Sequence, residues 1–103
     1  AIDAGEPVVL PQVDSIADGL LPVRSGDQTF AHVREFVDEV VLVEDSEIRE
    51  AAKFLFGQER LVVEFSGAAT VAALRSGRVQ SNGRTVVAIV SGGNTDPGMI
   101  ANL

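Results

Sequence analysis

The sequence contains no cysteine, no tyrosine and no tryptophan, and five phenylalanines supply all of its large aromatic side chains. Without cysteine the chain has no disulfide and no thiolate ligand for a metal ion. Basic residues are also few, with eight Lys and Arg against fifteen Asp and Glu, and they are scattered. A net charge of −7, with no basic cluster and no Tyr or Trp for base stacking, argues against a nucleic-acid partner.

Long apolar runs are absent too, since none approaches the roughly 20 residues of a membrane-spanning helix. The first residues, AIDAGEPVVLPQVDS, carry no basic segment and do not read as a signal peptide, so removed upstream sequence is the simpler explanation of a start without Met. We therefore expect a cytoplasmic protein with no membrane partner. Apolar residues still make up 46% of the chain, which indicates that some of them face a partner or another part of the same polypeptide.

Helical segments are the clearest local pattern. Residues 1–14 contain two prolines and no helical period, which predicts an extended lead-in. The segment from Glu44 to Arg60 is predicted to be an amphipathic helix that buries Ile48, Ala51, Ala52 and Leu55. Further helical segments are expected at 15–21, at 29–37 with Thr29 as N-cap, between an N-cap at Ser66 and a stop at Gly77, and after Asp96-Pro97.

Short apolar, β-branched segments separate these helices, at residues 39–44, 61–65 and 85–90. Strands that are apolar throughout and alternate with helices predict an α/β fold of three layers, with a mostly parallel sheet covered on both faces. Ligands of such sheets bind at the carboxyl ends of the strands.

The last of these segments ends in Ser91-Gly92-Gly93-Asn94, at such a carboxyl end. Glycines leave the backbone bare and permit positive φ, and a serine hydroxyl can donate or accept a hydrogen bond. Three interpretations stay open from these residues alone. They are an anion site at a helix N-terminus, a hydroxyl aimed at a ring heteroatom, and a tight turn with a capping serine.

Glu64 interrupts an apolar segment at its carboxyl end, directly before a helix. A charge there is costly unless it is paired or solvated, so Glu64 either meets water or the helix N-terminus, or serves as an acid beside a ligand. The single histidine, His32, is interpreted as a surface residue. The acidic residues decorate helix faces and ends, and the chain has no Ser/His/Asp set, HExxH or P-loop pattern, so we expect no metal site.

The order of five segments resembles one enzyme family. These segments are SIADGL, RSGDQTF, VDEVVLVEDSEIREAAKFLF, VVEFSGAATVAALRSG and VVAIVSGGN, which span roughly Ser15 to Asn94. Together they resemble the C-terminal portion of the catalytic domain of threonine/serine dehydratases, a pattern that serine racemase shares. These are pyridoxal-phosphate enzymes of fold type II, the tryptophan-synthase-β fold. Phe65 stands where the dehydratases usually have proline, in Glu-Pro-Ser/Ala-Gly.

The resemblance implies roles for particular residues. Ser91 matches the serine that hydrogen-bonds the pyridine nitrogen, and a hydroxyl makes the ring a milder electron sink than a carboxylate would. Gly26 matches a glycine whose backbone lies by the cofactor's reactive imine, Glu64 matches an acid nearby, and Asn94 matches a position that helps bind a nucleotide effector in serine racemase. The cofactor-binding residues implied in this way are Ser91, Gly92, Gly93, Asn94, Gly26 and Glu64.

The same resemblance implies an incomplete site. The only lysine, Lys53, does not match the family's Schiff-base lysine, so no catalytic residue is assigned within residues 1–103. We expect this chain to be the C-terminal portion of the catalytic domain of a lyase that converts threonine or serine to a 2-oxo acid and ammonia. Its partners would be a small amino acid, the remainder of the domain and further copies in a homo-oligomer. The alternatives are serine racemase activity and a non-catalytic module that binds an anion or nucleotide at Ser91–Asn94. An inactive fragment is compatible with the lyase interpretation, and we expect residues 1–103 alone to be inactive.

Overall fold

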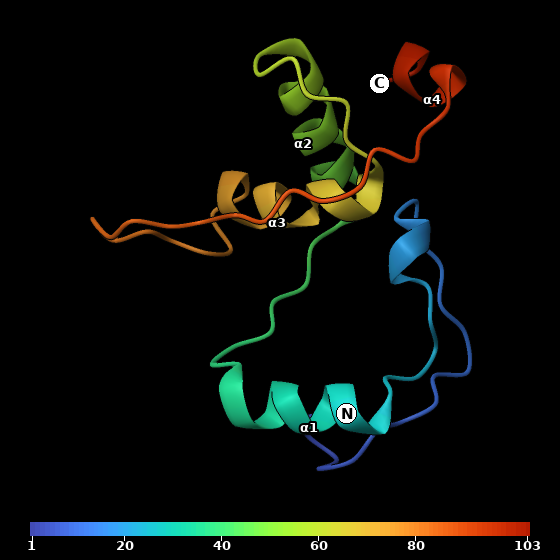
Figure 1. Cartoon of the computed structure of the whole chain (residues 1–103), viewed down its shortest axis with the longest axis vertical. Coiled ribbons are helices and arrows are strands. Elements are labelled where there is room, and N and C mark those ends of the chain that lie inside the picture. Colours follow the sequence, from blue (N-terminus) through green and yellow to red (C-terminus); the bar gives the residue numbers. More distant parts are fainter.

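The computed structural model describes residues 1–103 as five helical elements joined by extended segments. In chain order these are the 3-10 turn η1 (Asp18–Leu20), α1 (Asp27–Phe36), α2 (Asp45–Gly57), α3 (Phe65–Arg75) and α4 (Pro97–Ala101). Helices α2 and α3 cross and pack on each other, while α1 lies apart from them and packs on no other helix (Figure 1). None of these helices combines the length and the apolar character needed to cross a membrane.

The core is formed where α2 meets α3. The four α2 residues predicted to be buried are all buried, which confirms the amphipathic pattern of that helix. Opposite them, α3 presents Ala68 and Ala72, both fully buried, and these small side chains let the two helix backbones approach closely. Ala17, just before η1, and Val63, just before α3, complete the same cluster. The core therefore fixes both turns that precede η1 and α3.

The helix ends were predicted with mixed success. The stop at Gly77, which has φ +81°, and the cap of α4 are confirmed, since the Asp96 carboxylate accepts the Met99 N–H at 2.7 Å. The predicted N-caps at Thr29 and Ser66 are wrong, because the helices begin at Asp27 and Phe65. Ser66 instead uses its hydroxyl to accept a hydrogen bond from another turn.

The segments predicted as strands run extended, but no strand pairing connects them in this structure. Their apolar side chains are largely exposed, and the exposed fraction reaches 80% at Leu42, 83% at Val87 and 73% at Ile89. One backbone hydrogen bond links the segment 61–65 to the turn that follows the last segment, from the Glu64 N–H to the Gly92 carbonyl at 3.1 Å. A strand is stabilised by its neighbours, and here three apolar segments lack neighbouring strands.

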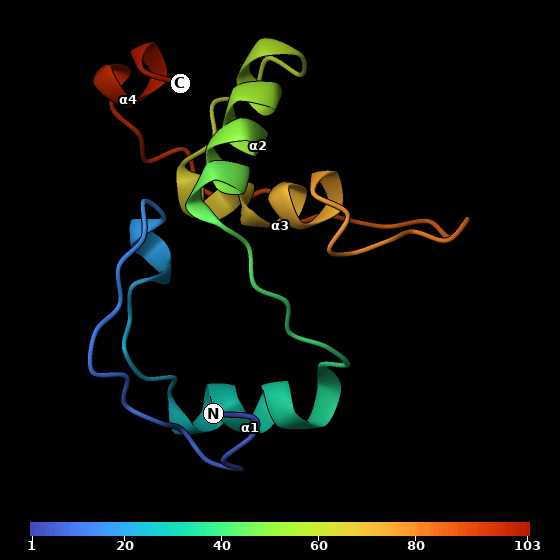
Figure 2. The same cartoon turned by 180° about the vertical axis from the view of Figure 1, so that it is seen from behind.

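A projecting loop connects α3 to the last extended segment, and Figure 2 shows it reaching away from the helices. At its tip the Arg84 N–H donates to the Ser81 carbonyl at 2.8 Å, and Asn82 and Gly83 have φ of 49° and 78°. Positive φ at both central residues is the geometry of a type I′ turn, which joins antiparallel strands. The turn lies in the sequence QSNGR, whose Asn-Gly pair is typical of this turn type.

Candidate functional site

Three turns from distant parts of the chain meet at the amino-terminal end of α3. They are η1, the Glu64–Gly67 start of α3, and Ser91–Gly93 at the end of the last extended segment. Figure 1 shows this last segment running along α3 before it turns toward α4. Two of the turns, Glu64 and Ser91–Gly93, contain residues that the sequence analysis selected as ligand-binding.

The last extended segment is held along α3 by direct contacts. The Thr70 hydroxyl donates to the Ile89 carbonyl at 2.8 Å. One helical turn earlier, the buried Gly67 lies so close to the Ser91 carbonyl that a side chain at Gly67 would overlap that oxygen. The position of Ser91 is therefore set by a glycine in the first turn of α3, which the sequence analysis did not single out. Its only signal in the sequence is a glycine near the start of a helix, where glycine costs stability.

Glu64 contacts the same turn from the other side. Gly92 has φ +83°, a conformation that favours glycine, and a side chain there would fall onto the Glu64 carboxylate. The backbone of the two residues is linked by the Glu64 N–H to Gly92 carbonyl hydrogen bond. The structure thus brings Glu64 and Gly92 into contact.

The third turn joins through Ser66, whose Oγ accepts the Gly19 N–H at 2.8 Å. Gly19 lies close to Ser66, since a side chain at Gly19 would come within 2.7 Å of that Oγ. The Asp18-Gly19 pair lies in the segment 15–21 that was expected to be helical, and it forms the 3-10 turn η1 there. Its glycine also proves to be a packing partner of α3, which the local sequence did not indicate.

Ser91, Gly93 and Asn94 remain accessible at this junction. Ser91 is exposed, and its hydroxyl forms no hydrogen bond within the chain. Gly93 is exposed as well, and a side chain there would make only an ordinary contact, 3.4 Å, with the Val62 carbonyl oxygen. The hydroxyl and the bare backbone beside it are therefore free to contact a flat, hydrogen-bonding group.

Gly26 and Lys53 lie elsewhere. Gly26 is the N-cap of α1, and the atom nearest to a side chain there would be Thr29 Oγ1 at 3.5 Å. Because α1 packs on no other helix, the structure does not bring Gly26 to Ser91 or Glu64. Lys53 is exposed on α2.

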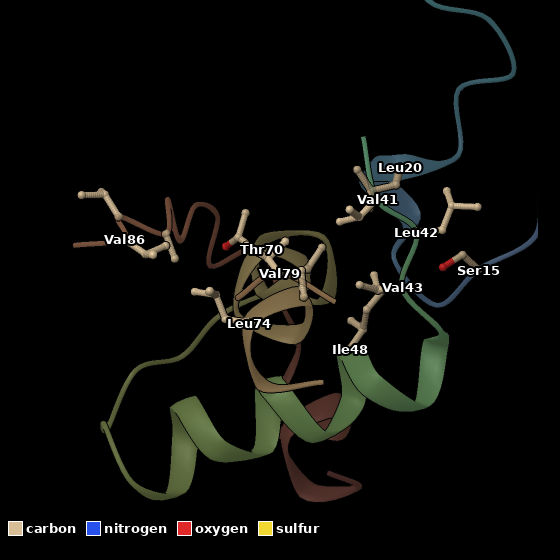
Figure 3. Close-up of a pocket in the computed structure, with 14 residues that line it drawn as sticks. Ser15, Leu20, Val41, Leu42, Val43, Ile48, Thr70, Leu74, Val79 and Val86 are labelled. Atoms are coloured by element: carbon tan, nitrogen blue, oxygen red, sulfur yellow. The ribbon is translucent and has the colours of Figure 1, made fainter. Parts of the chain in front are cut away.

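A large apolar cavity is distinct from this junction. It is an open groove of about 560 Å³, and twelve of its fourteen lining residues are hydrophobic. Figure 3 shows Val41, Leu42 and Leu20 on one side of α3 and Val86 on the other, with Thr70 and Leu74 between them. Neither Ser91 nor Glu64 lines it. The groove is the uncovered apolar surface between α3 and the extended segments, and it offers almost no polar group that could orient a ligand.

Comparison with known proteins identifies the family. The family model described as "Pyridoxal-phosphate dependent enzyme" matches residues 1–92, and the chain belongs to this family. A biosynthetic L-threonine dehydratase of Pasteurella multocida is 40% identical over 96 residues, and an L-threonine ammonia-lyase of Thermotoga maritima is 41% identical over 86 residues. These alignments cover 91% and 84% of this chain but 19% and 21% of the relatives, so the chain spans about a fifth of their length.

Solved structures agree with this assignment. A threonine deaminase from T.th. superposes with a TM-score of 0.83 at 33% identity, covering 92% of this chain and 32% of that one. Maize serine racemase gives the same TM-score at 35% identity, covering 98% of this chain and 33% of that one. These neighbours are fold type II pyridoxal-phosphate enzymes, which supports the expected α/β class. The resemblance drawn from the five sequence segments is confirmed.

Proposed function

We propose that this chain forms part of the catalytic domain of a pyridoxal-phosphate-dependent lyase that removes water and ammonia from threonine or serine. Within the site, this chain would supply the surface that contacts the pyridine ring, formed by Glu64 and Ser91–Asn94. We call this surface the wall. The observation that carries this proposal is the accessible hydroxyl of Ser91, which has no partner in the chain and is held in place by α3. The dehydratase names of the relatives support the reaction class.

The residues at the junction fit the cofactor. Bound pyridoxal phosphate supplies an electron-withdrawing ring that stabilises negative charge at the Cα of an amino acid. The Ser91 hydroxyl would donate to the pyridine nitrogen without protonating it, and the bare backbone of Gly93 would lie against the ring. Glu64, fixed against Gly92, would place a carboxylate at the edge of the same wall. Asn94 is the next residue after Gly93 in the chain. Gly26, at the start of α1, would have to reach the cofactor from that helix.

We further propose that the three exposed extended segments join a mostly parallel sheet completed by the remainder of the domain. Apolar side chains such as those of Leu42, Val87 and Ile89 are exposed here, and pairing with further strands would bury them. In this arrangement residues 1–14 are the lead-in to the C-terminal portion of the domain. A homo-oligomer remains a prediction.

The proposal is tested with the full-length polypeptide, added pyridoxal phosphate and threonine. We expect visible absorbance from the bound cofactor and formation of 2-oxobutyrate. Ser91→Ala should lower kcat more than it lowers cofactor binding, and Ser91→Asp should increase transamination, because a carboxylate holds a proton on the ring nitrogen. Ser76→Ala, at the far end of α3, serves as the matched control. A protein that stays colourless with added cofactor would reject the proposal.

Serine racemase activity is the second candidate, because maize serine racemase is among the structures that cover nearly the whole chain. Formation of D-serine from L-serine, measured alongside 2-oxo acid production, separates the two reactions. A non-catalytic anion-binding module is less well supported. The α4 N-terminus that follows Asn94 is already capped by the Asp96 carboxylate, which would repel an anion.

A further inference from the structure

Phe65 occupies the first helical position of α3. Proline is favoured at this position because its ring fixes φ near the helical value and the first amide has no partner within the helix. The chain is already arranged as proline would require, since Glu64 has φ −66° and ψ 158°, the extended conformation imposed on a residue before proline. Phe65 has no such covalent constraint, so another contact must hold the start of the helix.

That contact comes from α2. The Arg49 guanidinium carbon lies 5.3 Å from the centre of the Phe65 ring, within the range of a cation–π interaction. Arg49 forms no ion pair, and Phe65 packs partly buried against the core cluster. We infer that Arg49 and Phe65 are positioning residues, which fix the first turn of α3 and through it Glu64 and the Ser91–Gly93 turn.

The neighbours of Phe65 make the site sensitive to this contact. Glu64, the preceding residue, bonds to Gly92 and supports it. Ser66, the following residue, accepts the Gly19 N–H, and Gly67 abuts the Ser91 carbonyl. A rotation of the first turn of α3 would therefore disturb both neighbouring turns at once. The role as positioning residues for a cofactor wall rests on the proposed function, whereas the coupling of the three turns does not.

Hydrogen exchange of the Glu64 and Gly19 amides reports on these turns directly. In the full-length polypeptide, Arg49→Gln and Phe65→Leu should each speed exchange of both amides about two- to fivefold, the effect of losing a cation–π contact that is only partly buried. Arg49→Lys and Phe65→Tyr should stay near wild type, because a cation or a ring face remains. The matched control is Arg75→Gln, which removes a contact of 4.1 Å between Arg75 and Phe54 at the other end of α3. It should leave both amides unchanged.

A proline at position 65 distinguishes a positioning role of Arg49 from a general effect of Arg49 on stability. Phe65→Pro supplies the missing constraint, so Arg49→Gln should have no effect on either amide in that background. Two results would overturn the inference: unchanged exchange in Arg49→Gln, or equal acceleration by Arg75→Gln. Neither exchange measurement involves the cofactor, so failure of this inference would leave the lyase proposal intact. Conversely, a wild-type protein that stays colourless would reject the lyase proposal and leave the exchange results valid.

Discussion

The contact between Gly67 and Ser91 gives the most direct test of how the site is held. In Gly67→Ala the added methyl group would overlap the Ser91 carbonyl oxygen, 2.8 Å from the carbonyl carbon and 3.0 Å from Val63 Cγ1. The nearest obstacle is main chain, which cannot rotate away as the end of a flexible side chain can. Either the last extended segment must leave α3, or α3 must shift in the core.

The magnitude follows from two opposing effects. Overpacking a buried position costs about 1–3 kcal/mol. Replacing glycine by alanine within a helix contributes about 0.5–1 kcal/mol in the other direction. We therefore expect the free energy of unfolding to fall in Gly67→Ala, by up to about 2.5 kcal/mol. Displacement of Ser91 should also weaken cofactor binding in the full-length polypeptide.

Urea unfolding of Gly67→Ala, compared with wild type and Gly57→Ala, measures this effect. Gly57 is also helical, at the end of α2, and a side chain there would meet no atom within 4 Å. Gly57→Ala should thus be neutral or stabilising by up to about 1 kcal/mol. If Gly67→Ala matched Gly57→Ala in stability and kept wild-type exchange at the Glu64 amide, the close packing of Gly67 on Ser91 would be refuted.

Further predictions concern the core, the charge network and the exposed glycine. Leu55→Ala, at a buried position of α2, should lower the unfolding free energy by about 2–4 kcal/mol in urea titrations, and a loss under about 1 kcal/mol would contradict its place in the core. Hydrogen bonds from the Arg78 guanidinium, then from a backbone N–H, lower the pKa of Glu47, so stability should rise with pH in the acidic range below the ordinary pKa of a glutamate. That part of the pH dependence should vanish in Glu47→Gln and persist in Glu59→Gln. Gly93→Ala should leave urea unfolding unchanged and weaken pyridoxal phosphate binding, and a loss of stability instead would show that Gly93 packs internally.

The sign of the pH effect comes from proton binding. Between the lowered pKa of folded Glu47 and the ordinary glutamate value of about 4.3, the unfolded chain binds more protons than the folded one. Raising the pH through this window therefore favours the folded state. The contribution of Glu47 is complete above the ordinary value and is lost as the pH falls through the folded pKa.

Local pattern predicted the features of this chain that depend on local chemistry. The α2 helix and its buried side follow from spacing alone, because burial repeats with the helical period. The stop at Gly77 and the cap at Asp96 follow from residue conformations that the sequence determines directly. The Ser66 cap failed because its hydroxyl bonds to Gly19, 47 residues away, and local sequence cannot show this competition.

Strand pairing could not be predicted from local sequence either, because it also depends on residues far apart in the chain. Apolar β-branched segments predict extended backbone, and the structure has it, but a ladder also needs a partner strand. The backbone hydrogen bond from Glu64 to Gly92, just beyond the last of these segments, forms at the amino-terminal end of α3. Gly67 was likewise missed, since its importance depends on the Ser91 carbonyl that packs against it.

Gly92 and Gly93, at the end of the last extended segment, have different structural roles, which only the packing distinguishes. From the sequence, Gly92 and Gly93 look equivalent, as bare backbone for a ligand. In the structure the space beside Gly92 is filled by the Glu64 carboxylate, and its φ of +83° would strain any other residue. Both glycines are exposed, but only beside Gly93, next to the free Ser91 hydroxyl, is there room for a side chain without overlap. Under the proposed function, Gly92 would let the turn pack against Glu64 while Gly93 would face the ligand, and α3 would set the position of both through the contact of Gly67 with Ser91.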